Sequence, residues 1–117
     1  ITRLVEDYSG SEPKFVRLDN NRTIIRQDSI LYIQKEGMKT IFYTDTREYE
    51  TYSSFKVIML QLPDTFIQCH KSYIVNSSYV SIYKYDAVQM TDGTILPISQ
   101  KYRKLMKSCL TELYRKE

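Results

Sequence analysis

The sequence predicts a mainly β domain of nine or ten short strands with two helices. Tyrosine is unusually frequent, with eleven residues among 117 against four phenylalanines and no tryptophan, and aromatic residues favour strands. Short runs that alternate apolar and polar residues are separated by turns rich in Gly, Asn and Asp. Helical spacing of apolar residues occurs in only two places, so a parallel βαβ architecture is not expected.

Five strands, joined by turns, are predicted in the first half of the chain. The turns contain Asn, Asp, Ser or Gly, which accept the backbone conformations and local hydrogen bonds that chain reversals need. Gly37 is expected to close a hairpin between the third and fourth strands. The predicted strands cover residues 15–19, 22–27, 30–35, 39–44 and 48–52.

A short helix is predicted next, because the period of the apolar residues changes there from strand-like to helical. Ser53 or Ser54 can cap its N-terminus, since a hydroxyl oxygen accepts from an otherwise unpaired N–H group. Pro63 and Asp64 end it. Its apolar residues are Phe55, Ile58, Met59 and Leu62.

Strands resume after this helix, and Asp92-Gly93 is a hairpin signal between the last two of them. A second helix follows Ser99, which is predicted to cap it. The later strands cover residues 66–69, 73–75, 79–83, 87–90 and 94–96. The apolar stripe of the second helix, expected to pack in the core or at a dimer contact, consists of Tyr102, Leu105, Met106, Cys109, Leu110 and Leu113.

The length of 117 residues fits one domain with one core. The net charge is only +3, but residues 99–107 contain four basic residues and no acidic one. No apolar run approaches the roughly 18 residues of a membrane-spanning helix, and no signal-peptide pattern opens the chain. We therefore expect a cytoplasmic protein that does not contact the membrane.

Cys69-His70 is the one place where a nucleophile and a base are adjacent in the sequence. Neighbouring residues in a strand point to opposite faces, so this pair is poorly placed to share a proton. The G-x-S-x-G elbow and the glycine-rich phosphate loops are also missing from the sequence. We expect no catalytic residue, no cofactor and no metal site, and we expect Cys69 and Cys109 to be free thiols.

Residues 1–13 have the composition of a linker, with Gly10 and Pro13 in a run of small and polar residues. The first residue is Ile1 rather than Met, which suggests a fragment of a longer protein. We expect residues 1–13 to be a linker from an upstream domain and residues 14–117 to be the folded domain.

Three motifs occur in order along the chain. The first is Ile30-Leu31-Tyr32-Ile33 with Glu36-Gly37, and the second, FIQCHKSYIVN at residues 66–76, contains F-x-x-x-H-x-S-x-x-V-N. The third is Thr91-Asp92-Gly93, followed by Leu96-Pro97-Ile98-Ser99 and the basic run Q-K-Y-R-K. Over about residues 14–110 their order and spacing resemble the LytTR family, the DNA-binding output domain of many bacterial two-component response regulators.

The resemblance implies an elongated arrangement of antiparallel sheets, about ten strands in all, with one short internal helix and a C-terminal helix. It implies sequence-specific binding of double-stranded DNA by loops inserted into successive major grooves. It further implies transcription regulation within a phosphorelay, an N-terminal receiver domain upstream of residue 14, promoter sites arranged as direct repeats, and a possible homodimer on DNA.

The resemblance also assigns three DNA contact points. In the first hairpin, Met38 can pack on a thymine methyl group. Alternatively, Lys39 makes the DNA contact and Met38 makes none. Lys35 is a weaker candidate, for phosphate. These residues follow or precede the turn at Gly37.

In the central motif, Lys71 is expected to contact a phosphate or a guanine edge. His70 has two open roles, as a phosphate contact or as a hydrogen-bonded residue that holds the loop. Ser72 can donate to a phosphate or cap the loop. Asn76 is expected to lock the turn after its strand rather than to contact DNA.

The third contact point opens the second helix. Gln100 can bond bidentately to adenine, and the N–H groups of a helix N-terminus favour a phosphate. Lys101 and Arg103 add positive charge. Two other functions remain open: a β module that binds single-stranded nucleic acid through its tyrosines, and a protein-interaction domain.

Overall fold

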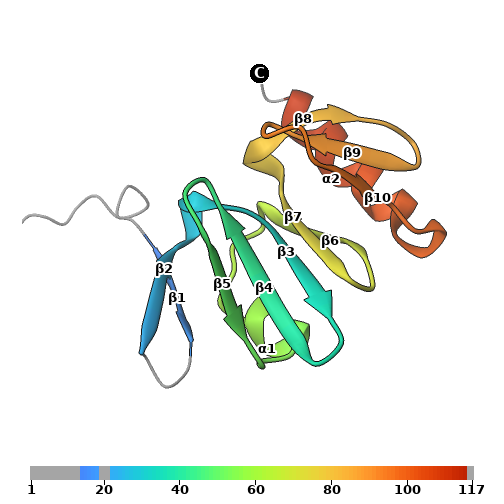
Figure 1. The fold of residues 1–117 in the computed structure, drawn as a ribbon. Coiled ribbons are helices and arrows are strands. Elements are labelled where there is room, and N and C mark those ends of the chain that lie inside the picture. The colour runs from blue at the N-terminus through green and yellow to red at the C-terminus, as the bar shows by residue number, and fades with distance from the viewer. Residues whose placement is uncertain (1–13, 19–21, 116–117) are drawn as a thin grey trace, which may run out of the picture.

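The computed structural model describes residues 14–18 and 22–115, with side chains described up to residue 111, so the predicted linker at residues 1–13 lies outside the described residues. Within these residues ten strands form three antiparallel sheets, of two, five and three strands (Figure 1). The predicted mainly β, antiparallel, multi-sheet class is confirmed.

The five-stranded sheet forms the centre of the fold, with strand order β5-β4-β3-β7-β6. The strands β3 to β5 follow each other as a meander, and the hairpin β6–β7 joins them through the pairing of Ile33 with Ile74. The strand bounds are β3 (Ile30–Glu36), β4 (Lys39–Thr44), β5 (Glu48–Thr51), β6 (Phe66–His70) and β7 (Tyr73–Asn76).

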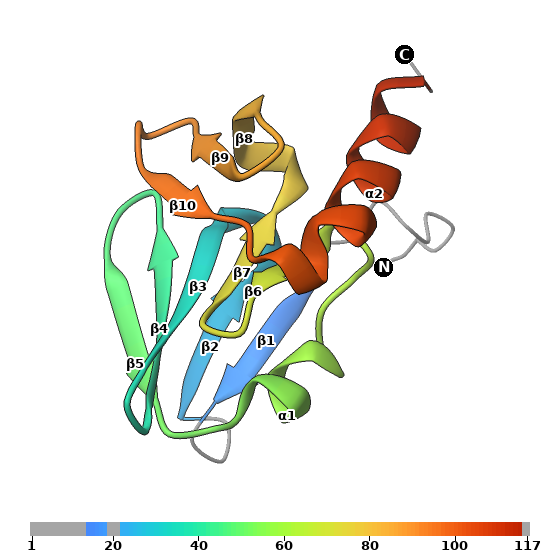
Figure 2. The same cartoon turned by 90° about the vertical axis from the view of Figure 1, so that its right-hand side faces the viewer.

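Two smaller sheets and two α-helices flank this centre (Figures 1 and 2). The two-stranded sheet consists of β1 (Phe15–Leu18) and β2 (Thr23–Arg26), and the three-stranded sheet of β8 (Val80–Tyr83), β9 (Ala87–Met90) and β10 (Ile95–Pro97). The α-helices are α1 (Phe55–Met59) and α2 (Arg103–Arg115). Short 3-10 turns are η2 (Gln27–Ser29), η3 (Ser77–Tyr79) and η4 (Gln100–Tyr102).

The central sheet has a hydrophobic core on each of its two faces. Successive side chains of a strand point to opposite faces, so neighbouring residues of one strand belong to different cores. In β7, Ile74 belongs to the core shared with β1, β2 and α1, whereas Val75 belongs to the core shared with β9, β10 and α2. In β6, Phe66 and Ile67 divide in the same way. The domain therefore has two hydrophobic cores with the central sheet between them, rather than the one core expected from its length.

The turns and caps follow the sequence in most places. Gly37 and Gly93 both have positive φ, 64° and 94°, as the predicted hairpin turns require. Ser54 caps α1, since its side chain accepts from the N–H group of Val57 at 3.3 Å. The helix ends at Met59 rather than at Leu62, because the N–H groups that follow turn back to carbonyls three residues earlier.

One detail of the second helix was predicted wrongly. The Ser99 side chain makes no capping hydrogen bond, and the chain enters α2 through the 3-10 turn η4 instead. Leu105 is exposed, whereas Met106 and Leu110 are buried in the core with Tyr102 and Cys109 packed against it. The side chain of Leu113 lies outside the described part.

Candidate nucleic-acid interface

The three predicted contact points lie on the same side of the molecule: the β3–β4 turn, the β6–β7 turn and η4 (Figures 1 and 2). Two main-chain hydrogen bonds join them. The N–H group of Lys35 donates to the carbonyl of Ser72 at 2.8 Å, and the N–H group of Ser99 donates to the carbonyl of Cys69 at 3.0 Å. The segments are thus fixed to one another through the central sheet, which makes one continuous surface of them.

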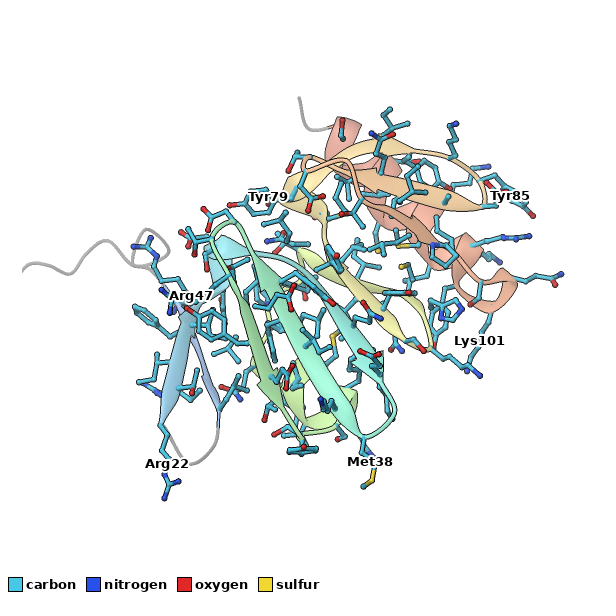
Figure 3. The ribbon with its side chains drawn as sticks, viewed as in Figure 1. Arg22, Met38, Arg47, Tyr79, Tyr85 and Lys101 are labelled. Atoms are coloured by element: carbon cyan, nitrogen blue, oxygen red, sulfur yellow. The ribbon has the colours of Figure 1, made fainter. Side chains whose placement is uncertain are left out.

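The β3–β4 turn ends this surface. Met38 lies at the tip and is 84% exposed, with its side chain pointing away from the sheet (Figure 3). Lys39 is also exposed, but its Nζ lies 3.7 Å from a carboxylate oxygen of Glu50 on β5. The tip therefore presents an apolar side chain and a lysine whose charge is partly balanced by an acidic neighbour.

The β6–β7 turn presents Lys71 in the middle of the surface. Lys71 is exposed, and in the described part of the chain no acidic side chain forms an ion pair with it. His70 supports the turn, because its Nδ1 accepts from the N–H group of Ser72 at 3.1 Å and its ring lies 5.5 Å from that of Tyr73. Ser72 is half-buried. His70 thus has the loop-holding hydrogen bond that was one of its two predicted roles.

The third point contains Gln100 and Lys101, both exposed. Figure 3 shows Lys101 pointing outward from η4, and its Nζ lies 5.5 Å from the ring centroid of Tyr102. Arg103 is half-buried and lies over the ring of Tyr85, with its Nε donating to the carbonyl of Ile98 at 3.3 Å. Lys101 and Arg103 are the two basic residues predicted at this contact point. Lys101 is exposed to solvent, whereas Arg103 packs against the protein.

Comparison with known proteins decides which family this geometry belongs to. The family model of the LytTr DNA-binding domain matches residues 20–111. The chain belongs to this family. DNA binding in transcription regulation, the activity of LytTr domains, is therefore the function class of the chain.

Two relatives support the assignment. The sensory transduction protein LytT of Bacillus subtilis is 26% identical over 110 residues, which are 88% of this chain and 45% of the relative. The chain thus spans less than half the length of that relative. The LytTr DNA-binding domain of a methyl-accepting/DNA response regulator from Bacillus cereus has a TM-score of 0.72 and 25% identity, over 83% of this chain and 96% of the other.

Cys69 and His70 of the LytTr domain differ in their surroundings. The pairing of β6 with β7 is irregular between Gln68 and His70, and His70 is half-buried at the turn. Cys69 is fully buried in the core below β10, and its Sγ donates to the carbonyl of Pro97 at 3.5 Å. Burial raises the pKa of this thiol from 9.0 to about 12, so it is a thiol rather than a reactive thiolate at neutral pH. Cys69 and Cys109 are both free.

In the described part of the LytTr domain, no group of three or more His, Cys, Asp or Glu side chains is placed to hold a metal ion. No helix among the described residues is long and apolar enough to cross a membrane. The exposed groups at the three contact points include the cations of Lys71 and Lys101, the amide of Gln100 and the thioether of Met38.

Sequence reasoning missed two features of this surface. One is Tyr85 in the β8–β9 turn, which contacts Arg103. The other is Gln34, which lies on β3 opposite Tyr73 and whose Oε1 accepts from the hydroxyl of Tyr43 at 3.2 Å. The contact of Tyr85 with Arg103 joins a turn to a helix, and the contact of Gln34 with Tyr43 depends on the register of the predicted hairpin.

Proposed function

We propose that this LytTr domain binds double-stranded DNA sequence-specifically by placing its three segments in successive major grooves. The observation that carries the proposal is the surface on which the β3–β4 turn, the β6–β7 turn and η4 are joined by the hydrogen bonds Lys35–Ser72 and Ser99–Cys69. A protein surface held in one shape can meet several grooves without a large entropy cost on binding.

Some side chains along this surface suit contacts to phosphates, and others suit contacts to base edges. Lys71 and Lys101 are exposed cations without an ion-pair partner among the described residues, so they are free to contact phosphates or guanine edges. Gln100 has an amide that can bond adenine bidentately. Met38 fits the methyl group of thymine, and the Lys39–Glu50 ion pair makes Met38 the better base reader of the two hairpin residues.

We further propose that the domain is the output domain of a transcriptional response regulator in a two-component system. The supporting facts are the names of the relatives, a sensory transduction protein and a response regulator. On this proposal residues 1–13 connect residues 14–117 to an upstream receiver domain in a cytoplasmic protein. Promoter direct repeats and a homodimer on DNA belong to the same proposal.

Two of the tyrosines are unsuited to the single-strand alternative, whereas Tyr52 and Tyr85 are 73% and 68% exposed. A platform for base stacking needs an aromatic ring whose face is free. Tyr32 is only 7% exposed, and its ring stacks on that of Tyr43 at a centroid distance of 4.5 Å. These two tyrosines therefore stack on each other and are not presented to bases.

The proposal is tested by measuring binding to a duplex selected from a random pool and to its separated strands. Duplex binding should be much tighter. Lys71→Ala and Lys101→Ala should each weaken it and lower the salt dependence of log K by about 0.9 for each lost phosphate contact. Arg47→Ala is the matched control, since Arg47 is an exposed cation in the β4–β5 loop, at the end of β4 away from Met38 (Figure 3).

Preference for the single strands would overturn the proposal in favour of the single-strand alternative. Equal affinity of the wild type, Lys71→Ala and Lys101→Ala for the duplex would show that the surface has been assigned to the wrong side of the domain.

A further inference from the structure

We propose that Tyr85 positions Arg103 to bind a DNA phosphate beside η4, so that the β8–β9 turn belongs to the DNA-binding machinery. This inference rests on the proposed duplex binding and adds a residue on a fourth segment of the chain. Figure 3 shows Tyr85 on the side of the molecule where Lys101 lies.

The guanidinium of Arg103 is held from two directions. Its central carbon lies 4.8 Å from the centroid of the Tyr85 ring, within the range of a cation–π contact. Its Nε donates to the carbonyl of Ile98 at 3.3 Å. Together the ring contact and the hydrogen bond hold the guanidinium beside Tyr85 and fix the position of its Nε.

The turn that carries Tyr85 is itself fixed to this region. The N–H group of Ile98 donates to the carbonyl of Asp86 at 2.9 Å, and the N–H group of Lys84 donates to the carbonyl of Ala87 at 2.8 Å. Ile98 thus bonds to both the turn and Arg103, and it directly precedes the segment that leads into η4. The geometry of Tyr85 and Arg103 is therefore built into the main chain.

One side of the guanidinium remains available. An arginine has five N–H donors, and those on its two Nη atoms form a fork that matches a phosphate group. Within the described residues the side chain of Arg103 makes one hydrogen bond, through Nε, and no ion pair. The Nη donors and the full positive charge are left for a ligand.

Tyr85 orders the side chain of Arg103 before DNA binds. A free arginine side chain loses rotamer entropy when it binds a phosphate, and a stacked one has already lost it. Tyr85 is 68% exposed, so burial in the core does not account for an aromatic side chain at this position. The contact with Arg103 gives a reason for a tyrosine at position 85, since its ring supports the guanidinium.

The experiment measures duplex affinity over a range of salt concentrations for five variants: Arg103→Gln, Arg103→Lys, Tyr85→Ala, Tyr85→Phe, and the double variant Tyr85→Ala/Arg103→Gln. Arg103→Gln should weaken binding about tenfold and lower the salt slope by about 0.9, the signature of one lost phosphate contact. Arg103→Lys should keep the slope but bind more weakly, because an ammonium cannot form the fork.

Tyr85→Ala should weaken binding several-fold, Tyr85→Phe should match the wild type because it keeps the ring, and Tyr85→Ala should add nothing once Arg103 is Gln. Thermal unfolding of each variant checks that it folds. An unchanged salt slope in Arg103→Gln overturns the phosphate contact, and additive effects of the two substitutions overturn the positioning role.

Lys71→Ala in the same series separates this inference from the function on which it rests. If Lys71→Ala weakens duplex binding and the Arg103 and Tyr85 variants do not, the inference fails and the proposed surface stands. If the wild type shows no duplex binding, both fail.

Discussion

Asn76 and Ile30 are joined by a buried hydrogen bond, in which Nδ2 of Asn76 donates to the Ile30 carbonyl at 2.9 Å. Oδ1 of the same side chain accepts from the N–H group of Ser78 at 3.0 Å. One amide thus joins the end of β7 to the beginning of β3 and starts the turn η3. Asn76 is only 2% exposed, and this is the turn-locking role predicted from the sequence.

Asn76→Ala should lower the free energy of unfolding by about 1–3 kcal/mol, because a buried carbonyl is left without a donor. Urea unfolding measures the change. Ser78→Ala is the matched control, since Ser78 is exposed and contributes to this contact only its main-chain N–H group. A loss no larger than that of the control would contradict the role of Asn76.

Cys69 should make the domain less stable at alkaline pH. Its pKa is about 12 in the folded protein and near 9.0 in the unfolded chain. The thiol therefore stays protonated to a higher pH in the folded state than in the unfolded one. The contribution to stability is complete below pH 9 and is lost as the pH rises towards 12. Between pH 8 and pH 10 the contribution of Cys69 to the free energy of unfolding should fall by about 1.4 kcal/mol.

Unfolding of Cys69→Ala at the same two pH values isolates this effect. The substitution lowers stability at pH 8 through the cavity that it leaves, but the decrease towards pH 10 should shrink, while Cys109→Ala should keep it. Burial also raises the pKa of Tyr32 and Tyr43. Because their ordinary value is 10.0, they add to the decrease as the pH approaches 10, and this part should remain in Cys69→Ala. An unchanged decrease in Cys69→Ala would contradict the assignment.

Glu50→Gln should strengthen binding to DNA by a few-fold at low salt. The substitution removes the carboxylate that lies 3.7 Å from Nζ of Lys39 and frees this cation for a phosphate. Stability should change by less than about 1 kcal/mol, because exposed ion pairs contribute little. Glu48→Gln on the same strand is the control for the general loss of a negative charge. Equal gains in both variants would show that Lys39 has no special part.

Gln100→Arg should change the base preference at one position of the DNA site, from adenine towards guanine, because arginine bonds bidentately to guanine O6 and N7. Selection of bound duplexes from a random pool, carried out for the wild type and the variant, gives the comparison. Lys104→Arg controls for the added guanidinium. An identical selected sequence would remove Gln100 from the base-reading residues.

Local sequence patterns were sufficient for most of the fold. The strand at residues 39–44 and the left-handed turns at Gly37 and Gly93 appear where they were predicted, because alternation and backbone sterics act over a few residues. Ser99 was predicted wrongly as a side-chain cap. The main-chain N–H group of Ser99 donates to the carbonyl of Cys69, a contact between distant segments that a local pattern does not contain.

The residues of the candidate surface could be predicted from the sequence, but their contacts with neighbouring residues could not. Lys39 meets Glu50 through the register of β4 with β5, and Arg103 meets Tyr85 through the packing of the β8–β9 turn beside α2. Both contacts join residues that the sequence analysis did not connect, and Lys101 and Arg103 were given the same role of adding positive charge. The structure shows that their surroundings differ.

The pairing of β3 with β7 has a consequence for how the domain folds. The β3–β5 meander and the β6–β7 hairpin each join strands close in sequence and can form quickly, whereas the β3–β7 pairing, through Ile33 and Ile74, must close a long loop. We expect this closure to set the folding rate. The β3–β4 and β6–β7 turns become neighbours only when it is complete, so a chain emerging from the ribosome gains its capacity to recognise DNA late in folding.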